Sequence, residues 1–174
     1  MKNLIVTFLL TFSIAAQAFD DGHLDAHVHG LIEMNLVAEA NLVEVYITSP
    51  LMNLVGFEYA PRTKTEKAAI NVMATHFETP QKWLQFDGSV CQLIHHRVSH
   101  GEDHDHDHAR HESMHAELEA NYQFKCDSDN LNSVAVSLQE LFPAIESITL
   151  SWIVDTVSGL ATLHHGDSVV YFRQ

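Results

Sequence analysis

Two segments near the start of the chain alternate apolar and polar side chains. In residues 31–38 the even-numbered positions are apolar, and in residues 42–48 Val43, Val45 and Ile47 take the odd-numbered ones. A period of two is typical of a β-strand that buries one face and exposes the other. The polar residues between the two segments predict a turn, so the strands should pair as a β-hairpin.

A helix is predicted in residues 63–77. Thr63 and Glu66 stand at the spacing of a capping box, in which each side chain bonds to the backbone of the other. The expected buried stripe, at helical period, consists of Ala69, Met73 and Phe77. Pro80 follows the helix and cannot continue it. The preceding residues 51–61 are expected to form an apolar connection.

The second half of the chain predicts more strands. Residues 90–98 and 114–126 flank a histidine-rich stretch, and the second segment alternates again, so the two should form a long hairpin. Further expected elements are strands at 132–138, 149–156, 160–165 and 168–172, a short helix at 139–146, and turns at 158–159 and 166–167. The pattern therefore predicts an α+β fold, a mainly antiparallel β-sheet with one or two short helices and a long disordered His-rich loop.

Length, composition and charge narrow the class of protein. The 174 residues are 46% hydrophobic, which fits one globular domain. Residues 1–18 combine Lys2, an apolar run and a final Ala-Gln-Ala, the pattern of a secretory signal peptide, so the domain is expected at 19–174, outside the cytoplasm after export by the Sec pathway. No later stretch has the roughly 20 apolar residues of a membrane span. Loss of Lys2 takes the formal charge from −14 to −15, which excludes a nucleic-acid partner and favours cations.

The chain has two cysteines, Cys91 and Cys126. In an oxidising compartment an even pair is most simply a disulfide, and closing this loop of about 35 residues is worth on the order of 4 kcal/mol in the chain-entropy model. The alternative is a metal site made of Cys and His. Against that alternative, the cysteines bracket the histidine-rich stretch and do not stand at C-x-x-C spacing.

The histidine-rich stretch indicates metal binding. Residues 99–113 are expected to be a flexible His/Asp-rich loop, and His95 and His96 precede it. The candidate ligands in the loop are His100, His104, His106, His108 and His111. Many overlapping ligand sets exist, and each must order a mobile loop, so several weak and interchangeable sites are expected. The alternative is a solvated acidic loop that binds no metal.

His27 and His29 suggest a second kind of site. At positions i and i+2 of an extended strand they would point to the same face. If that strand lies beside the one carrying His115 and Glu117, a preformed site becomes possible. The alternative is two exposed histidines at a strand end. Glu58, in an apolar segment, is more simply a hydrogen-bonded structural residue than a ligand.

An enzyme is not expected. Residues 25–29 mimic the metal-binding strand of amidohydrolases, but that family needs a (β/α)8 barrel of about 250 residues. Neither H-E-x-x-H nor G-x-S-x-G occurs, and nothing assembles a nucleophile with a base. A metal-binding protein without catalytic activity is therefore favoured over a small metal-dependent hydrolase.

Several features together resemble one known family. They are the signal peptide, His27-Val28-His29-Gly30, residues 53–61 with Gly-Phe-Glu-Tyr-Ala-Pro, the two cysteines, the histidine loop and His115. The chain thus resembles periplasmic zinc-regulated proteins of the ZrgA type. Relatives carry His where this chain has Tyr59, so a ligand at that position would be weakened here.

The resemblance implies a periplasmic protein that binds Zn2+ and assists zinc acquisition. Its implied partner is the solute-binding protein of a zinc ABC importer. A copper- or nickel-sequestering protein, or a metal-storage protein, is the alternative, because nitrogen ligands accept all of these metals.

Overall fold

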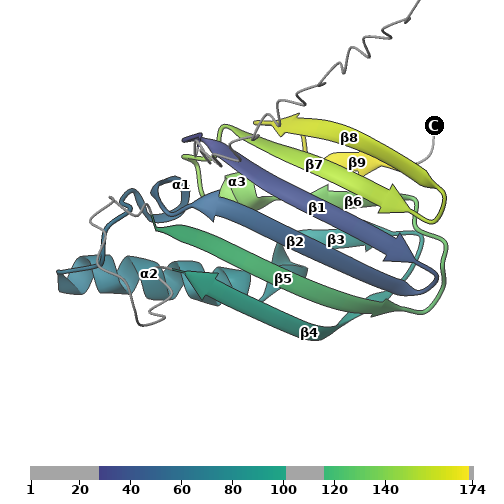
Figure 1. Cartoon of the computed structure of the whole chain (residues 1–174), viewed down its shortest axis with the longest axis horizontal. Helices are drawn as coiled ribbons and strands as arrows, with labels where there is room; N and C mark the ends of the chain where they lie inside the picture. Colours follow the sequence, from purple (N-terminus) through teal and green to yellow (C-terminus); the bar gives the residue numbers. More distant parts are fainter. Residues whose placement is uncertain (1–27, 101–115, 173–174) are drawn as a thin grey trace, which may run out of the picture.

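A six-stranded β-sheet is the main layer of the computed structural model, which describes residues 28–100 and 116–172. Its strands lie in the order β4-β5-β2-β1-β7-β8 (Figure 1). Their bounds are β1 Leu31–Glu39, β2 Leu42–Pro50, β4 Cys91–His100, β5 Glu117–Cys126, β7 Ser147–Val154 and β8 Val157–His164. Neighbouring strands are antiparallel except β1 and β7, which run parallel. The α+β, mainly antiparallel prediction is confirmed.

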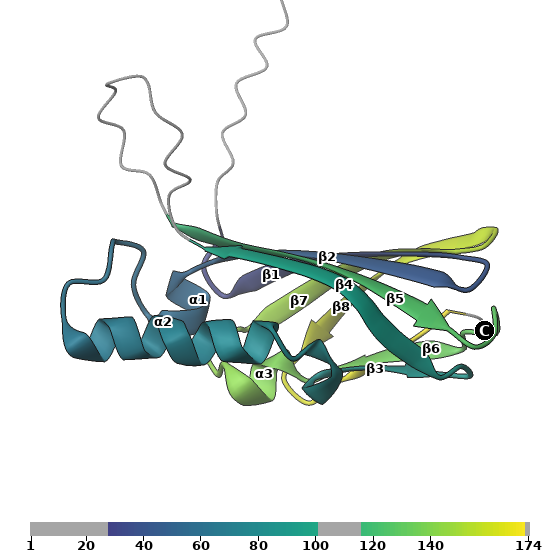
Figure 2. The ribbon, with the colours of Figure 1, turned by 90° about the horizontal axis from the view of Figure 1, so that it is seen from below.

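A second layer covers one face of this sheet. It contains the small sheet β3-β6-β9, with strands Leu84–Asp87, Ser133–Val136 and Val169–Tyr171, and the helices α2 (Lys64–Phe77) and α3 (Leu138–Leu141). Figure 2 shows the large sheet edge-on with these elements on one side. The shorter helical pieces are α1, Met52–Val55, and a 3-10 turn at Pro80–Lys82. No described helix is long and apolar enough to cross a membrane.

The two layers are joined by aromatic side chains. Phe77, Trp83 and Tyr122 are each at most 1% exposed. The Tyr122 hydroxyl, on the inner face of β5, donates to the carbonyl of Phe77 at the end of α2 over 2.7 Å. Burial raises the pKa of Tyr122, because the charged phenolate would lose its hydration there. This hydrogen bond fixes where α2 ends against the sheet.

Helix α2 begins as the sequence predicts. The Thr63 side chain accepts from the backbone of Glu66, and the Glu66 carboxylate accepts from the backbone of Thr63. Those backbone bonds, with one from Arg62, hold the pKa of Glu66 below its ordinary value. Met73 and Phe77 are buried as expected, whereas Ile70 takes the place predicted for the half-buried Ala69.

The long hairpin is also confirmed. Cys91 and Cys126 lie opposite each other in β4 and β5 and form a disulfide. The thiolates are therefore not metal ligands. A register shift between Leu93 and His95 bends β4, which is an edge strand of the large sheet.

Three local expectations differ from the structure. The turn expected at 158–159 lies at 155–156, where Asp155 has φ 52°, and Gly159 is inside β8. A Cβ at Gly159 would come within 2.5 Å of the Trp152 ring, so this glycine reflects close packing and not a turn. Strand β3 and helix α1 were not predicted, and the helix expected at 139–146 is the single turn α3.

Candidate metal site at one end of the sheet

One end of the large sheet gathers the residues next to the histidine-containing segments. Strands β1 and β5 begin there, and β2 and β4 end there, beside α1 (Figure 1). The register places Pro50 opposite Glu117 and His100 opposite Leu118. His29, His100 and Ala116 consequently lie at the same end, although they are far apart in sequence. We call this region the metal end.

His29 and Glu58 meet at the metal end. Nε2 of His29 lies 3.0 Å from Oε1 of Glu58, and the side chains are 59% and 11% exposed. The Glu58 carbonyl also accepts from the backbone N–H of Ala116, at 3.3 Å. Glu58 thus joins the turn before β1 to the residue that follows His115. Its carboxylate is largely shielded while the imidazole faces solvent, which leaves the pair accessible from outside.

Asn53 holds the turn in place. Its Oδ1 accepts from the Gly30 N–H at 2.7 Å, and its Nδ2 donates to the Leu31 carbonyl at 2.8 Å. Asn53 is 2% exposed and lies in α1, so the start of β1 is tied to the segment that carries Glu58. Gly30 has φ +83°, a left-handed conformation that a glycine adopts without strain. The backbone that follows His29 is therefore held in place by Asn53.

The spacing of the pair suits a zinc ion. Two ligand atoms at about 2.0–2.1 Å from a tetrahedral Zn2+ lie about 3.3 Å apart. The His29 and Glu58 atoms are 3.0 Å apart, so a small widening would admit the ion in place of the shared proton. Among residues 28–100 and 116–172, no three His, Cys, Asp or Glu side chains stand together as a ready cage. Any further ligands would have to move toward the pair or come from outside these residues.

Carboxylates surround the metal end on the open face of the sheet. Glu33 and Glu119 both face Thr48 across neighbouring strands, and Glu117 lies two residues before Glu119, at the start of β5. Burial, followed by the nearby Glu119 carboxylate, raises the pKa of Tyr46 in the same patch. Negative potential of this kind attracts divalent cations and speeds their encounter.

The structure separates the predicted ligands. The strand expected to lie beside the one carrying Glu117 is not its neighbour, because β2 runs between β1 and β5. His29 also lies in the turn before β1 and not on an extended strand. The contact between Glu58 and Ala116 links the two strands instead. The condition for the preformed site, two adjacent strands, is therefore not met, although both strands begin at the metal end.

The remaining candidates fall into two groups. His95 and His96 are exposed in the middle of edge strand β4, and as consecutive strand residues they point to opposite faces. His100 ends β4 at the metal end, but β4 is three strands from β1, roughly 14 Å at the usual strand spacing. The candidates that lie outside the described residues are His27, His104, His106, His108, His111 and His115.

A comparison with protein families now adds to this geometry. A model described as ZrgA family zinc uptake protein matches residues 26–172, a range that includes every residue the structure describes. The chain belongs to the ZrgA family. This confirms the resemblance noted in the sequence and indicates a role in zinc uptake. A search of curated proteins finds no match.

In this ZrgA family member Glu58 is hydrogen-bonded to His29, which agrees with the hydrogen-bonded carboxylate that the sequence suggested. Its apolar neighbours Phe57 and Tyr59 suggested a structural carboxylate, and the segment gave no periodic pattern. The neighbouring Tyr59 hydroxyl points to a different partner, because it donates a hydrogen bond to the Glu66 carboxylate at 3.0 Å. Gly56 and Pro61 lie on either side of Glu58 and interrupt regular structure. They indicate a chain reversal, and a carboxylate at a chain reversal lies near strand ends.

Proposed function

We propose that this protein captures Zn2+ in the periplasm and assists its uptake, with His29 and Glu58 as the anchored part of the site. The contact between these two side chains at 3.0 Å carries the proposal, because it places an imidazole and a carboxylate at near-ligand spacing. His27, two residues before His29, and His115, next to Ala116, complete the proposed ligand set. Glu117, the first residue of β5, is a further candidate ligand.

The histidine loop plays a different part in this proposal. His100, together with the loop ligands named above, offers several interchangeable imidazoles, which favours rapid capture over tight retention. His95 and His96 add donors along β4. The loop would collect ions and pass them to the anchored site. The proposed recipient is the solute-binding protein of a zinc ABC importer.

The carboxylate favours Zn2+ over Cu(I) at this site. Soft sulfur ligands select Cu(I), and both cysteines are held in the disulfide. An imidazole–carboxylate set suits Zn2+, so we infer that zinc outcompetes Cu(I) at the anchored site. Equal retention of both metals in a competition assay would instead favour the copper-sequestering alternative.

The test is zinc titration calorimetry on protein in which a short Gly/Ser linker replaces residues 101–111. This background removes most loop ligands and should retain one tight site. His29→Ala and Glu58→Gln should each weaken that site at least tenfold, or about 1.4 kcal/mol. His165→Ala is the matched control, because it removes an exposed imidazole from the turn after β8 that belongs to neither proposed ligand set.

Two results would overturn the proposal. Loss of all tight binding with the loop would make His29 and Glu58 ordinary surface residues. Unchanged zinc affinity in both His29→Ala and Glu58→Gln would lead to the same conclusion. A pH series adds a further check, since protons compete with zinc for imidazole and binding at pH 5 should be weaker than at pH 7.

A further inference from the structure

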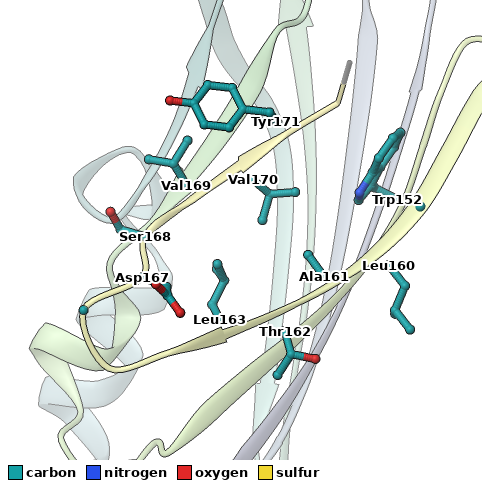
Figure 3. Close-up of a pocket in the computed structure, with 12 residues that line it drawn as sticks. Trp152, Leu160, Ala161, Thr162, Leu163, Asp167, Ser168, Val169, Val170 and Tyr171 are labelled. Atoms are coloured by element: carbon teal, nitrogen blue, oxygen red, sulfur yellow. The ribbon is translucent and has the colours of Figure 1, made fainter. Parts of the chain in front are cut away.

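Within residues 28–100 and 116–172, strand β8 forms one unpaired edge of the large sheet. It ends the strand order β4-β5-β2-β1-β7-β8, and the chain then turns into β9 of the small sheet. Between β8 and β9 lies a groove of about 920 Å³. In Figure 3, Ala161, Leu163 and Val170 point into this groove, whereas Leu160 and Thr162 point away from it. The groove is the open side of the two-layered core.

The two edges of the large sheet differ in how they are protected. Edge strand β4 carries Arg97, several histidines and a register shift after Leu93. Charges and bulges of this kind prevent strands from adding to an edge. Edge strand β8 has an unshifted register along its whole length and contains no Asp, Glu, Lys or Arg. Its central Leu160 is 69% exposed.

We propose that β8 pairs with β8 of a second copy of this chain, joining two six-stranded sheets into one. The residue pairs that β8 can form with itself select this occupant, and the absence of charged side chains on the strand permits it. The protein carries a formal charge of −14, so two copies repel each other wherever acidic surfaces meet. Contact through two uncharged strands avoids that repulsion. The inference does not depend on the proposed zinc site.

The sequence of β8 is complementary to itself in one register. With Leu160 opposite Leu160 of the second copy, Gly159 faces Ala161, Ser158 faces Thr162 and Val157 faces Leu163. Each pair joins like with like: small with small, hydroxyl with hydroxyl, and apolar with apolar. The pairs also keep inner-face residues with inner-face residues, as an antiparallel twofold requires. The Val157–Leu163 pairs would border the groove.

The size of the contact predicts a reversible dimer. Eight strand residues extend over about 27 Å, and a sheet layer is about 10 Å thick, which gives roughly 270 Å² per copy. Standard stable interfaces bury about 800 Å² per partner. Dimerisation should therefore depend on concentration. β8 ends at His164, opposite Ser147 at the metal end, so antiparallel pairing leaves the two metal ends at opposite ends of the joined sheet.

Cysteine cross-linking tests the pairing and its register. In Leu160→Cys the two new thiols would sit opposite each other, with Cα atoms about 4.5–5.5 Å apart, inside the range for a disulfide. In Ser158→Cys, the matched control on the same exposed face, the two thiols would lie roughly 14 Å apart. Diamide oxidation with EDTA present, which excludes metal-bridged dimers, should cross-link Leu160→Cys at least tenfold more than Ser158→Cys.

Sedimentation equilibrium of the full mature chain, also in EDTA, supplies the second measurement. The average mass should rise with concentration, and Leu160→Lys or Thr162→Lys should abolish the rise. Val72→Lys is the control, because Val72 is 58% exposed on α2, away from β8. A monomer from micromolar to near-millimolar concentration would overturn the proposal. Equal cross-linking of both cysteine variants, or a dimer unaffected by either lysine, would also overturn it.

Discussion

Replacing Asn53 by Ala tests how the fold holds the metal end. The substitution removes the acceptor of the Gly30 N–H and the donor to the Leu31 carbonyl, at 2.7 and 2.8 Å. Asn53 is 2% exposed, so water cannot easily replace either bond. A buried polar group left without a partner costs about 1–3 kcal/mol. Two such groups give an expected loss of about 2–6 kcal/mol in the free energy of unfolding.

Urea unfolding followed by tryptophan fluorescence measures this loss. Asn53→Asp keeps the acceptor for Gly30 but turns an oxygen toward the Leu31 carbonyl, so it should also destabilise the protein. Asn35→Ala, an exposed change in the middle of β1, should cost less than about 0.5 kcal/mol. If Asn53→Ala costs no more than Asn35→Ala, the side chain does not hold the start of β1, and the reasoning fails.

Zinc binding gives the same variant a second readout, which rests on the proposed function. His29 precedes Gly30, and loosening Gly30 lets the imidazole drift from Glu58. We expect roughly tenfold weaker binding at the anchored site, comparable to the loss of an orienting residue around a metal. Glu58→Gln should weaken zinc binding with little loss of stability. A variant that loses stability and keeps its zinc affinity would show that Asn53 supports the fold alone.

Three further variants address the core. Replacing Cys91 and Cys126 by Ser should lower the free energy of unfolding by about 4 kcal/mol in urea titrations; a loss under about 1 kcal/mol would contradict the loop-closure argument. Burial raises the pKa of Tyr122, so its neutral hydroxyl favours the folded state most below pH 10, and stability should fall above that pH as the unfolded phenol ionises. Tyr122→Phe should reduce this decrease of the free energy of unfolding above pH 10. An unchanged pH dependence would contradict the role assigned to the Tyr122 hydroxyl. Gly159→Ala should cost about 1–3 kcal/mol in thermal unfolding, because the new Cβ meets the Trp152 ring at 2.5 Å.

Periodicity was sufficient to predict the long strands. In β1 and β2 one face is buried and the other exposed, so the alternation in sequence reports the burial directly. The capping box at Thr63 was readable for a similar reason, since both partners lie within one helical turn. Local contacts leave local patterns. The disulfide was also predictable, because the chain has two cysteines and they pair in one way.

Contacts between distant segments were not predictable. Nothing in the sequence near Leu31 indicates that β7 will pair with β1 in parallel. The contact between His29 and Glu58 joins residues 29 positions apart, and it exists because Asn53 ties α1 to the start of β1. Gly159 illustrates a different error. The sequence predicted a turn at this glycine, but the glycine is required because the Trp152 ring packs directly against its backbone.

The construction of the metal end bears on how a capture protein can release its ion. Ordering one residue costs about 1–2 kcal/mol of backbone entropy, so each ligand that the fold already fixes raises affinity by avoiding that cost. Glu58 and His29 are fixed by contacts that do not involve metal. A cage with four such ligands would hold zinc tightly and release it slowly. Two fixed ligands, completed by residues that must be ordered on binding, give an intermediate affinity. On the proposed function, that balance lets the protein gather zinc and still pass it to a tighter partner.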